Sequence, residues 1–199
     1  MRLLLHVCCA PCLTVVLKGY RELGYDVTGL FHNPNIHPWK ERQRRLDSLR
    51  SYASEAGMDL LVDEAYPLEE NLRMLLAASN RCAACFAHRL GETARRAAEG
   101  GFERFATTLT VSPYQRPDLI LEAGTAAAAE HGVGFSFRDY RPAFRTSVEM
   151  SRERGLYRQP YCGCVMSERD RYLGIASPGQ GKERFYEAGE PGPERIIGG

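Results

Sequence analysis

Apolar and polar positions along the chain form blocks that predict strands and helices in turn. Apolar runs of strand length lie at residues 2–7, 25–33, 59–66, 102–112 and 133–140. Segments with helical periodicity or helix-boundary residues lie at 12–24, 39–57, 67–79, 82–101, 117–132, 143–155 and 166–174. This alternation predicts an α/β fold with a mostly parallel sheet flanked by helices, and with further helices beyond it.

The composition changes at Gly174, after which the chain becomes rich in glycine and proline. We therefore expect a single α/β domain over residues 1–173, which carries the functional site, and a C-terminal tail over residues 174–199.

Charge and hydropathy exclude several classes of protein. Lys and Arg number 26 against 25 Asp and Glu, so a nucleic-acid partner would need a local basic face. The apolar N-terminus resembles a secretory signal, but His6 and Pro11 interrupt it and no small-residue cleavage site follows. No stretch approaches the roughly 18 apolar residues of a membrane span. We expect a cytoplasmic protein with no membrane partner, in which thiols stay reduced.

The cysteines are the chemically distinctive feature. Their odd number and the cytoplasmic expectation both disfavour a disulfide framework. The first group follows a predicted strand and precedes a helix, where N-terminal amides stabilise thiolates. The carboxyl edge of a parallel sheet is where ligands gather, so long connections could bring the other groups to the same edge. The seven residues are Cys8, Cys9 and Cys12, then Cys82 and Cys85, then Cys162 and Cys164.

Thiolates at this density indicate a soft metal, because they select zinc, copper(I) or iron–sulfur clusters. One structural zinc ion needs only four ligands, and no histidine lies at a zinc-finger spacing. An iron–sulfur cluster, with a second metal or spare redox cysteines, uses the set better. Two alternatives stay open: a zinc-stabilised nucleic-acid-binding module, and a thiol–disulfide oxidoreductase that uses the "CAPC" dithiol at 9–12.

Five motifs in order resemble one known family. Between about residues 3 and 173 the chain resembles the cobalamin-independent epoxyqueuosine reductases. The motifs are "HVCCAPC" at 6–12, "FHNPNIHP" at 31–38, "RCAACFAHRL" at 81–90, "TTLTVSPYQ" at 107–115 and "LYRQPYCGCVMS" at 156–167.

The resemblance implies the last step of queuosine biosynthesis, in which epoxyqueuosine at the wobble position of a tRNA anticodon is reduced to queuosine. It implies a 4Fe–4S cluster with an additional iron, no cobalamin, and an electron donor that the sequence does not identify. It also implies a sheet similar to adenine-nucleotide-binding (HUP-like) domains. All seven cysteines lie in the matching motifs, so the resemblance assigns each a metal-binding role. Because "CCAPC" replaces a Gly/Ser-rich phosphate loop, we expect no use of ATP.

RNA contacts are sought in the basic segment "WKERQRRLDSLR" at 39–50. Arg42 and Arg45 are the candidates for phosphate contact, and a solvated helix face is the competing interpretation.

The reduction that the resemblance implies needs a proton donor, which we expect among residues near the sulfur groups or in the matching motifs. His6, Tyr114, Arg158 and Tyr161 are candidates by position, and packing or hydrogen bonding is the competing interpretation for each.

Overall fold

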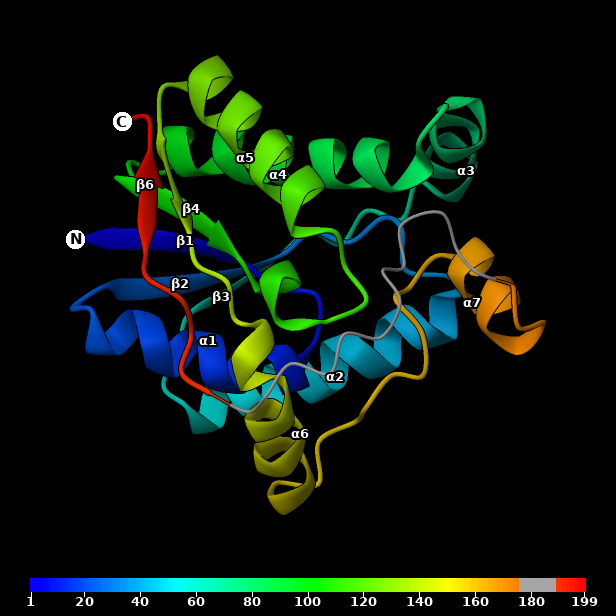
Figure 1. The fold of residues 1–199 in the computed structure, drawn as a ribbon, viewed down its shortest axis with the longest axis horizontal. Helices are drawn as coiled ribbons and strands as arrows, with labels where there is room; N and C mark the ends of the chain where they lie inside the picture. Colours follow the sequence, from blue (N-terminus) through cyan, green and yellow to red (C-terminus); the bar gives the residue numbers. More distant parts are fainter. Residues whose placement is uncertain (176–188) are drawn as a thin grey trace.

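The computed structural model describes residues 1–175 and 189–199, and its centre is a six-stranded sheet with the order β3-β2-β1-β4-β5-β6. Strands β1 to β5 pair in parallel, and β6 pairs antiparallel with β5 at one edge. The predicted parallel α/β architecture is therefore confirmed (Figure 1). The strands are β1 (Arg2–His6), β2 (Asp26–Phe31), β3 (Leu60–Val62), β4 (Arg104–Thr107), β5 (Gly134–Phe137) and β6 (Arg195–Ile197).

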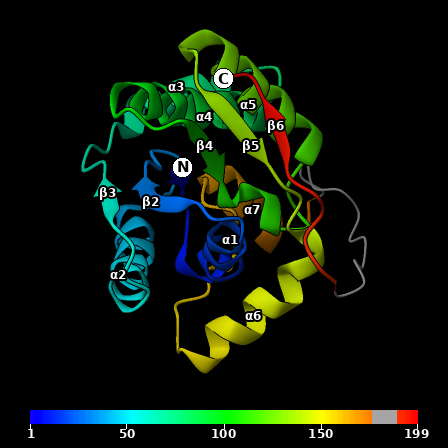
Figure 2. The ribbon, with the colours of Figure 1, turned by 90° about the vertical axis from the view of Figure 1, so that its left-hand side faces the viewer.

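Helices cover both faces of the sheet. Figure 2 shows α4 and α5 on one face and α1, α2 and α6 on the other. Helices α3 and α7 lie beyond the carboxyl ends of the strands (Figure 1). The helices are α1 (Ala10–Glu22), α2 (Trp39–Glu55), α3 (Leu68–Ala77), α4 (Arg81–Glu99), α5 (Pro117–His131), α6 (Phe144–Glu153) and α7 (Val165–Tyr172).

Strand β1 lies in the middle of the core. Leu3, Leu4 and Leu5 are all fully buried, as expected for a central strand of a parallel sheet covered on both faces. Helix α5 approaches the sheet closely at Gly124, where a Cβ atom would lie 2.1 Å from Cε1 of Phe135. The same Phe135 ring stacks on Phe105 of β4, with ring centroids 4.9 Å apart. This packing holds β4 and β5 in place against helix α5.

Several elements differ from the sequence prediction. The strands expected over 59–66 and 133–140 are shortened to Leu60–Val62 and Gly134–Phe137. The strand expected over 102–112 ends at Thr107, and a short 3₁₀ helix follows over Thr108–Val111, because the Thr107 hydroxyl accepts a hydrogen bond from the Leu109 amide. Inside the expected tail, Arg195–Ile197 forms β6 on the edge of the sheet. The division into a domain and a tail stays a prediction, as does the likeness to adenine-nucleotide-binding domains.

Across residues 1–175 and 189–199, every helix is too short or too polar to cross a bilayer.

Candidate metal centre

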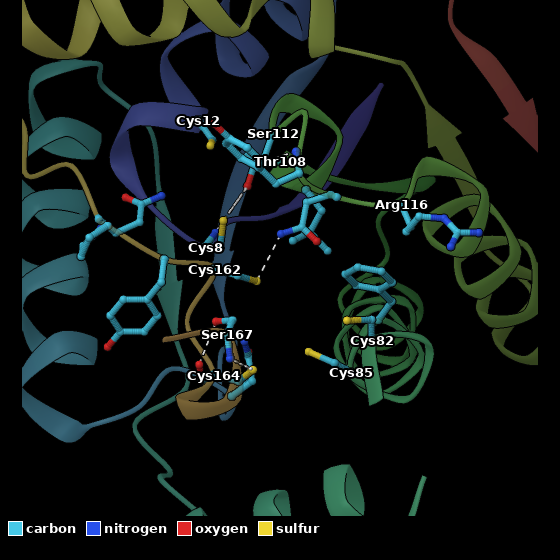
Figure 3. A pocket seen from close by; sticks show the side chains of 18 of the residues that line it. Cys8, Cys12, Cys82, Cys85, Thr108, Ser112, Arg116, Cys162, Cys164 and Ser167 are labelled. Atoms are coloured by element: carbon cyan, nitrogen blue, oxygen red, sulfur yellow. Dashed lines mark hydrogen bonds between the residues drawn. The ribbon is translucent and has the colours of Figure 1, made fainter. Parts of the chain in front are cut away.

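The three cysteine groups meet at one cavity of about 500 Å³. The first group comes from the loop after β1 and the first turn of α1, the second from the start of α4, and the third from the loop before α7. Figure 3 shows the cysteines that it labels, from all three groups, around the same space. The cysteines that line the cavity are Cys8, Cys12, Cys82, Cys85, Cys162 and Cys164.

The first group is held by the start of α1. Cys9 is the N-cap residue and Pro11 lies in the first turn, so Cys12 turns back toward the loop. The sulfur atoms of Cys8, Cys9 and Cys12 lie within 4.8 Å of one another, close enough to hold one metal ion. Hydrogen bonds with Cys12 and Cys9 hold the pKa of Cys8 well below its usual range. Hydrogen bonding within the group therefore favours a thiolate among these three sulfurs.

Helix α4 presents the second group one turn apart. The side chain of Asn80 caps the helix, because its Oδ1 accepts hydrogen bonds from the amides of Cys82 and Ala83 at 3.2 and 3.1 Å. Burial raises the pKa of Cys82 to about 11 and that of Cys85 to about 12, and charge on Cys162 or Cys164 raises both. These thiols stay protonated on their own, whereas a coordinated metal ion deprotonates its thiol ligands.

The third group depends on Gly163, which separates its two cysteines. Gly163 has φ of 147°, and a Cβ atom there would lie 3.1 Å from Ile36 Cγ1. Its carbonyl accepts a hydrogen bond of 2.8 Å from the His37 amide. The Gln115 side-chain amide donates to Cys162 Sγ at 3.1 Å, which orients that sulfur. The loop is thus fixed by main-chain and side-chain contacts before α7 begins.

Arg42 and Arg45 point into the protein in this structure. Each residue is 1% exposed, which disfavours both phosphate contact and a solvated helix face, and their contact with RNA stays a prediction. Arg42 donates to the carbonyl of Asp63. The Arg45 guanidinium donates to the carbonyls of Cys162 and Tyr161 at 2.8 and 3.0 Å, and its Nε donates to Glu41 at 2.7 Å. Arg45 is therefore an anchor for the third cysteine loop.

Of the four proton-donor candidates, three line the cavity and one does not. Tyr114, Arg158 and Tyr161 line it, whereas His6 does not and is fully buried. Tyr161 already donates its hydroxyl proton to the His37 carbonyl. Burial and the nearby Arg89 lower the pKa of His6 to about 3, so His6 is a neutral core histidine.

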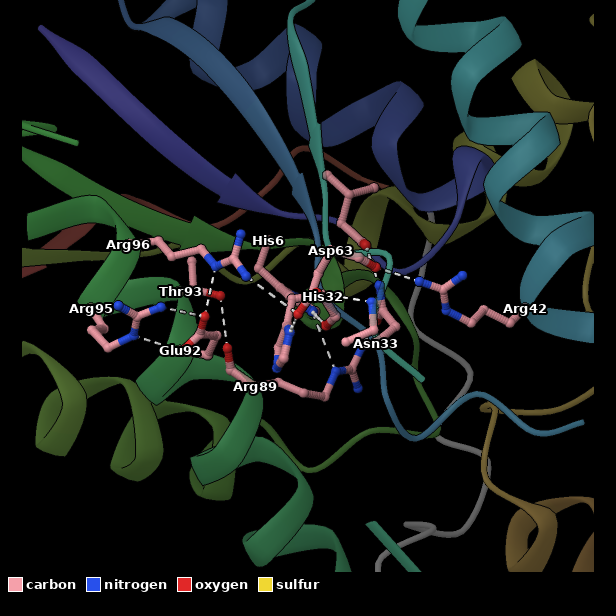
Figure 4. A network of polar contacts seen from close by, with 12 residues as sticks. His6, His32, Asn33, Arg42, Asp63, Arg89, Glu92, Thr93, Arg95 and Arg96 are labelled. Carbon is pink, nitrogen blue, oxygen red and sulfur yellow. Dashed lines mark hydrogen bonds and ion pairs between the residues drawn. The ribbon is translucent and has the colours of Figure 1, made fainter. Parts of the chain in front are cut away.

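A polar network behind the sulfurs went unnoticed at the sequence level. Figure 4 shows Arg89 of α4 lying beside His6 and Asn33, from the ends of β1 and β2. An arginine in an amphipathic helix is normally an exposed residue, so the sequence pattern gave no signal for this position. Burial opposes the charge of Arg89, yet charge on Cys85, Cys8 and Cys162 raises its pKa.

The chemistry of the cavity fits a soft metal. Among the described residues that line it, there is no aspartate, glutamate or histidine, while six contribute sulfur. Magnesium and calcium prefer oxygen ligands, so this donor set favours metals that take thiolates. All seven cysteines, which lie in the described part of the chain, carry free thiols. Fold and cavity define an α/β protein with a thiolate site suited to a soft metal.

Comparison with known proteins identifies the family. The family model described as "Epoxyqueuosine reductase QueH" matches residues 3–170. The chain is 40% identical to the epoxyqueuosine reductase QueH of Dehalococcoides mccartyi over 178 residues, which cover 89% of this chain and 98% of the relative. It is 34% identical to that of Thermotoga maritima, with 84% and 91% covered. The chain belongs to the epoxyqueuosine reductase QueH family and is an oxidoreductase.

Proposed function

We propose that this protein reduces epoxyqueuosine in the anticodon of a tRNA to queuosine, and that the reaction takes place in the cysteine-lined cavity. The observation that carries the proposal is the convergence of six cysteines from three distant segments in a member of this family. The reaction consumes two electrons and two protons and releases the epoxide oxygen as water. An RNA substrate agrees with the cytoplasmic location expected from the sequence.

The proposed cofactor is a 4Fe–4S cluster with an additional iron, held by all seven cysteines. The six thiols of the cavity lining, which includes no aspartate, glutamate or histidine among the described residues, support this assignment, as does the close Cys8–Cys9–Cys12 group. When bound, such a group supplies single electrons and a Lewis acid.

The chain's own residues orient the sulfurs and shape the space around them. Gln159 donates its side-chain amide to Cys9 Sγ at 3.0 Å, as Gln115 does to Cys162. The amide donors stabilise thiolates, because hydrogen bonds to a charged form favour that form. Apolar side chains that include Leu75, Phe86 and Val148 complete the lining and limit water. Tyr114, about one-third exposed, lies in the lining where a substrate would enter.

Arginines in the cavity lining are better placed for RNA contact than the buried Arg42 and Arg45 of α2. Arg81 is paired with Asp170, and Arg116 is paired with Asp118. Arg158 and Arg171 are exposed and form no ion pair within residues 1–175 and 189–199. Unpaired cations beside the cavity suit the phosphates of an anticodon loop, whose bases are unstacked and accessible.

Charge reversal at the cavity rim, which we define by Arg158 and Arg171, is expected to weaken RNA binding. Arg158→Glu and Arg171→Glu should each lower the affinity for tRNA and reduce the slope of log affinity against log salt by about one. The measurement is binding of the tRNA at several salt concentrations. Lys18→Glu is the control, because Lys18 is exposed on α1 and does not line the cavity. A slope equal to that of the unmodified protein in both rim variants would contradict this assignment.

The function itself is tested with protein purified and reconstituted without oxygen. We expect iron and acid-labile sulfide in the protein, and conversion of epoxyqueuosine to queuosine when the RNA is digested and its nucleosides are analysed by mass. A chemical reductant replaces the unidentified donor. Zinc without iron would support a zinc-stabilised module, and a metal-free protein with a titratable dithiol would support thiol–disulfide exchange.

A further inference from the structure

Arg89 is a buried cation whose contacts include no carboxylate. Its side chain lies in the interior, with 1% of the residue exposed. Nε donates to His6 Nε2 at 3.3 Å, one terminal nitrogen donates to Asn33 Oδ1 at 2.7 Å, and the other lies 3.9 Å from Cys85 Sγ. Throughout the described ranges 1–175 and 189–199, Arg89 forms no ion pair with an acidic side chain.

The charge of Arg89 needs a counter-charge. Arginine stays protonated in proteins, and burial of an unpaired charge is strongly unfavourable. His6 and Asn33 accept hydrogen bonds from the guanidinium but are neutral, so they orient it without balancing its charge. The sulfur atoms are the groups beside it that can become anionic.

The network holds the guanidinium in one orientation. His6 Nε2 lies 3.3 Å from Arg89 Nε and 3.2 Å from the His32 carbonyl oxygen. Because arginine only donates, Nε2 accepts from Arg89 in the tautomer that carries its proton on Nδ1, which then donates to Thr107 Oγ1 at 2.9 Å. Asn33 uses its amide nitrogen to donate to the Val7 carbonyl at 2.8 Å, which leaves Oδ1 for Arg89. The remaining terminal nitrogen faces Cys85, one turn earlier on α4. Residues at or just after the carboxyl ends of β1, β2 and β4 thus orient the guanidinium toward the cysteines of the cavity.

We propose that Arg89 is a positioning residue that supplies the fixed counter-charge of the thiolate metal centre and raises the centre's reduction potential. A metal centre with several thiolate ligands carries net negative charge, and reduction adds more. A fixed cation at its edge favours both the assembled centre and its reduced form. The effect on potential rests on the proposed function, whereas the effect on metal binding applies to any soft metal.

The test compares Arg89→Met with the unmodified protein in two measurements. In protein reconstituted with iron and sulfide, a redox titration followed by electron paramagnetic resonance should give a more negative midpoint potential for the variant. We expect a tenfold smaller equilibrium constant for reduction, which is about 59 mV for a one-electron couple. In metal-free protein, added Zn²⁺ should raise the melting temperature less in the variant.

Two further variants sharpen the comparison. Asn33→Asp keeps Arg89 but places a carboxylate where the amide oxygen lies 2.7 Å from it, so this nearly isosteric change should also lower the potential. It provides the measurement if Arg89→Met does not fold. Arg95→Met is the matched control on α4, because Arg95 is exposed and already paired with Glu92 and Glu99. Its potential and its response to Zn²⁺ should be unchanged.

The outcomes separate this proposal from the proposed function. If no iron is incorporated but stabilisation by Zn²⁺ still depends on Arg89, the counter-charge stands and the iron–sulfur function fails. If iron is incorporated and neither the potential nor the Zn²⁺ effect changes in Arg89→Met and Asn33→Asp, the counter-charge is refuted. Absence of any metal binding refutes both.

Discussion

Replacement of Cys82 or Cys162 by alanine is expected to abolish metal incorporation and turnover. The two residues come from different segments, the start of α4 and the loop before α7, and both line the cavity that Cys8 also lines. Removal of one thiolate from a shared centre leaves a coordination position without its ligand. Loss of outer partners of a metal site already costs about 10–100-fold, so we expect turnover to fall by more than about 100-fold. The measurements are iron and sulfide per chain and queuosine formed per chain.

The control for these variants is Thr125→Ala, an exposed position on α5 that does not line the cavity. It should keep the metal content and turnover of the unmodified protein, as surface substitutions usually change stability by less than about 0.5 kcal/mol. If Cys82→Ala and Cys162→Ala both retained full iron content and full activity, the centre would not be shared between the segments.

The central part of the fold was predictable because its signal is local. Each of the five parallel strands is a short apolar run, and the core strand β1 is buried on both faces. Strand β6 was not predicted, because "RII" lies in a Gly/Pro-rich stretch and pairs with Phe135 and its neighbours far away in the chain. Such an edge strand is defined by its partner more than by its own sequence.

The sequence predicted which residues could supply metal ligands, but not the buried arginines whose hydrogen bonds hold the site in place. The clustering of the cysteines and the position of the first group after a strand predicted a thiolate site at the carboxyl edge of the sheet. The contacts of Arg45 were not predicted, because its acceptors are carbonyls of Tyr161 and Cys162, which no pattern around residue 45 reveals. The role of Arg89 on α4 was missed for the same reason, since its partner His6 comes from strand β1, far away in the sequence.

Arg45→Met is expected to destabilise the protein strongly and to lower its metal content. Arg45 is paired with Glu41, which is itself 5% exposed. Among residues 1–175 and 189–199, the substitution leaves this buried carboxylate with the Tyr157 hydroxyl as its one side-chain hydrogen-bond donor. Removal of one partner of a buried ion pair costs about 3–5 kcal/mol. The third cysteine loop also loses two hydrogen bonds to its carbonyls. The measurements are the free energy of unfolding from denaturant titration of metal-free protein, and iron content after reconstitution.

Three further variants distinguish the effect of losing the buried Arg45–Glu41 ion pair from the effect of losing the hydrogen bonds to the third cysteine loop. Lys40→Met, at an exposed cation on the same helix, should change the unfolding free energy by less than about 0.5 kcal/mol. The double variant Arg45→Met with Glu41→Gln should recover part of the lost stability, because the unpaired charge is gone, but should keep the low iron content. Arg45→Lys retains the positive charge without the planar fork, so it should also hold less iron. A single Arg45→Met variant with unchanged stability and full iron content would show that the carbonyl contacts do not hold the Cys162–Cys164 loop in place.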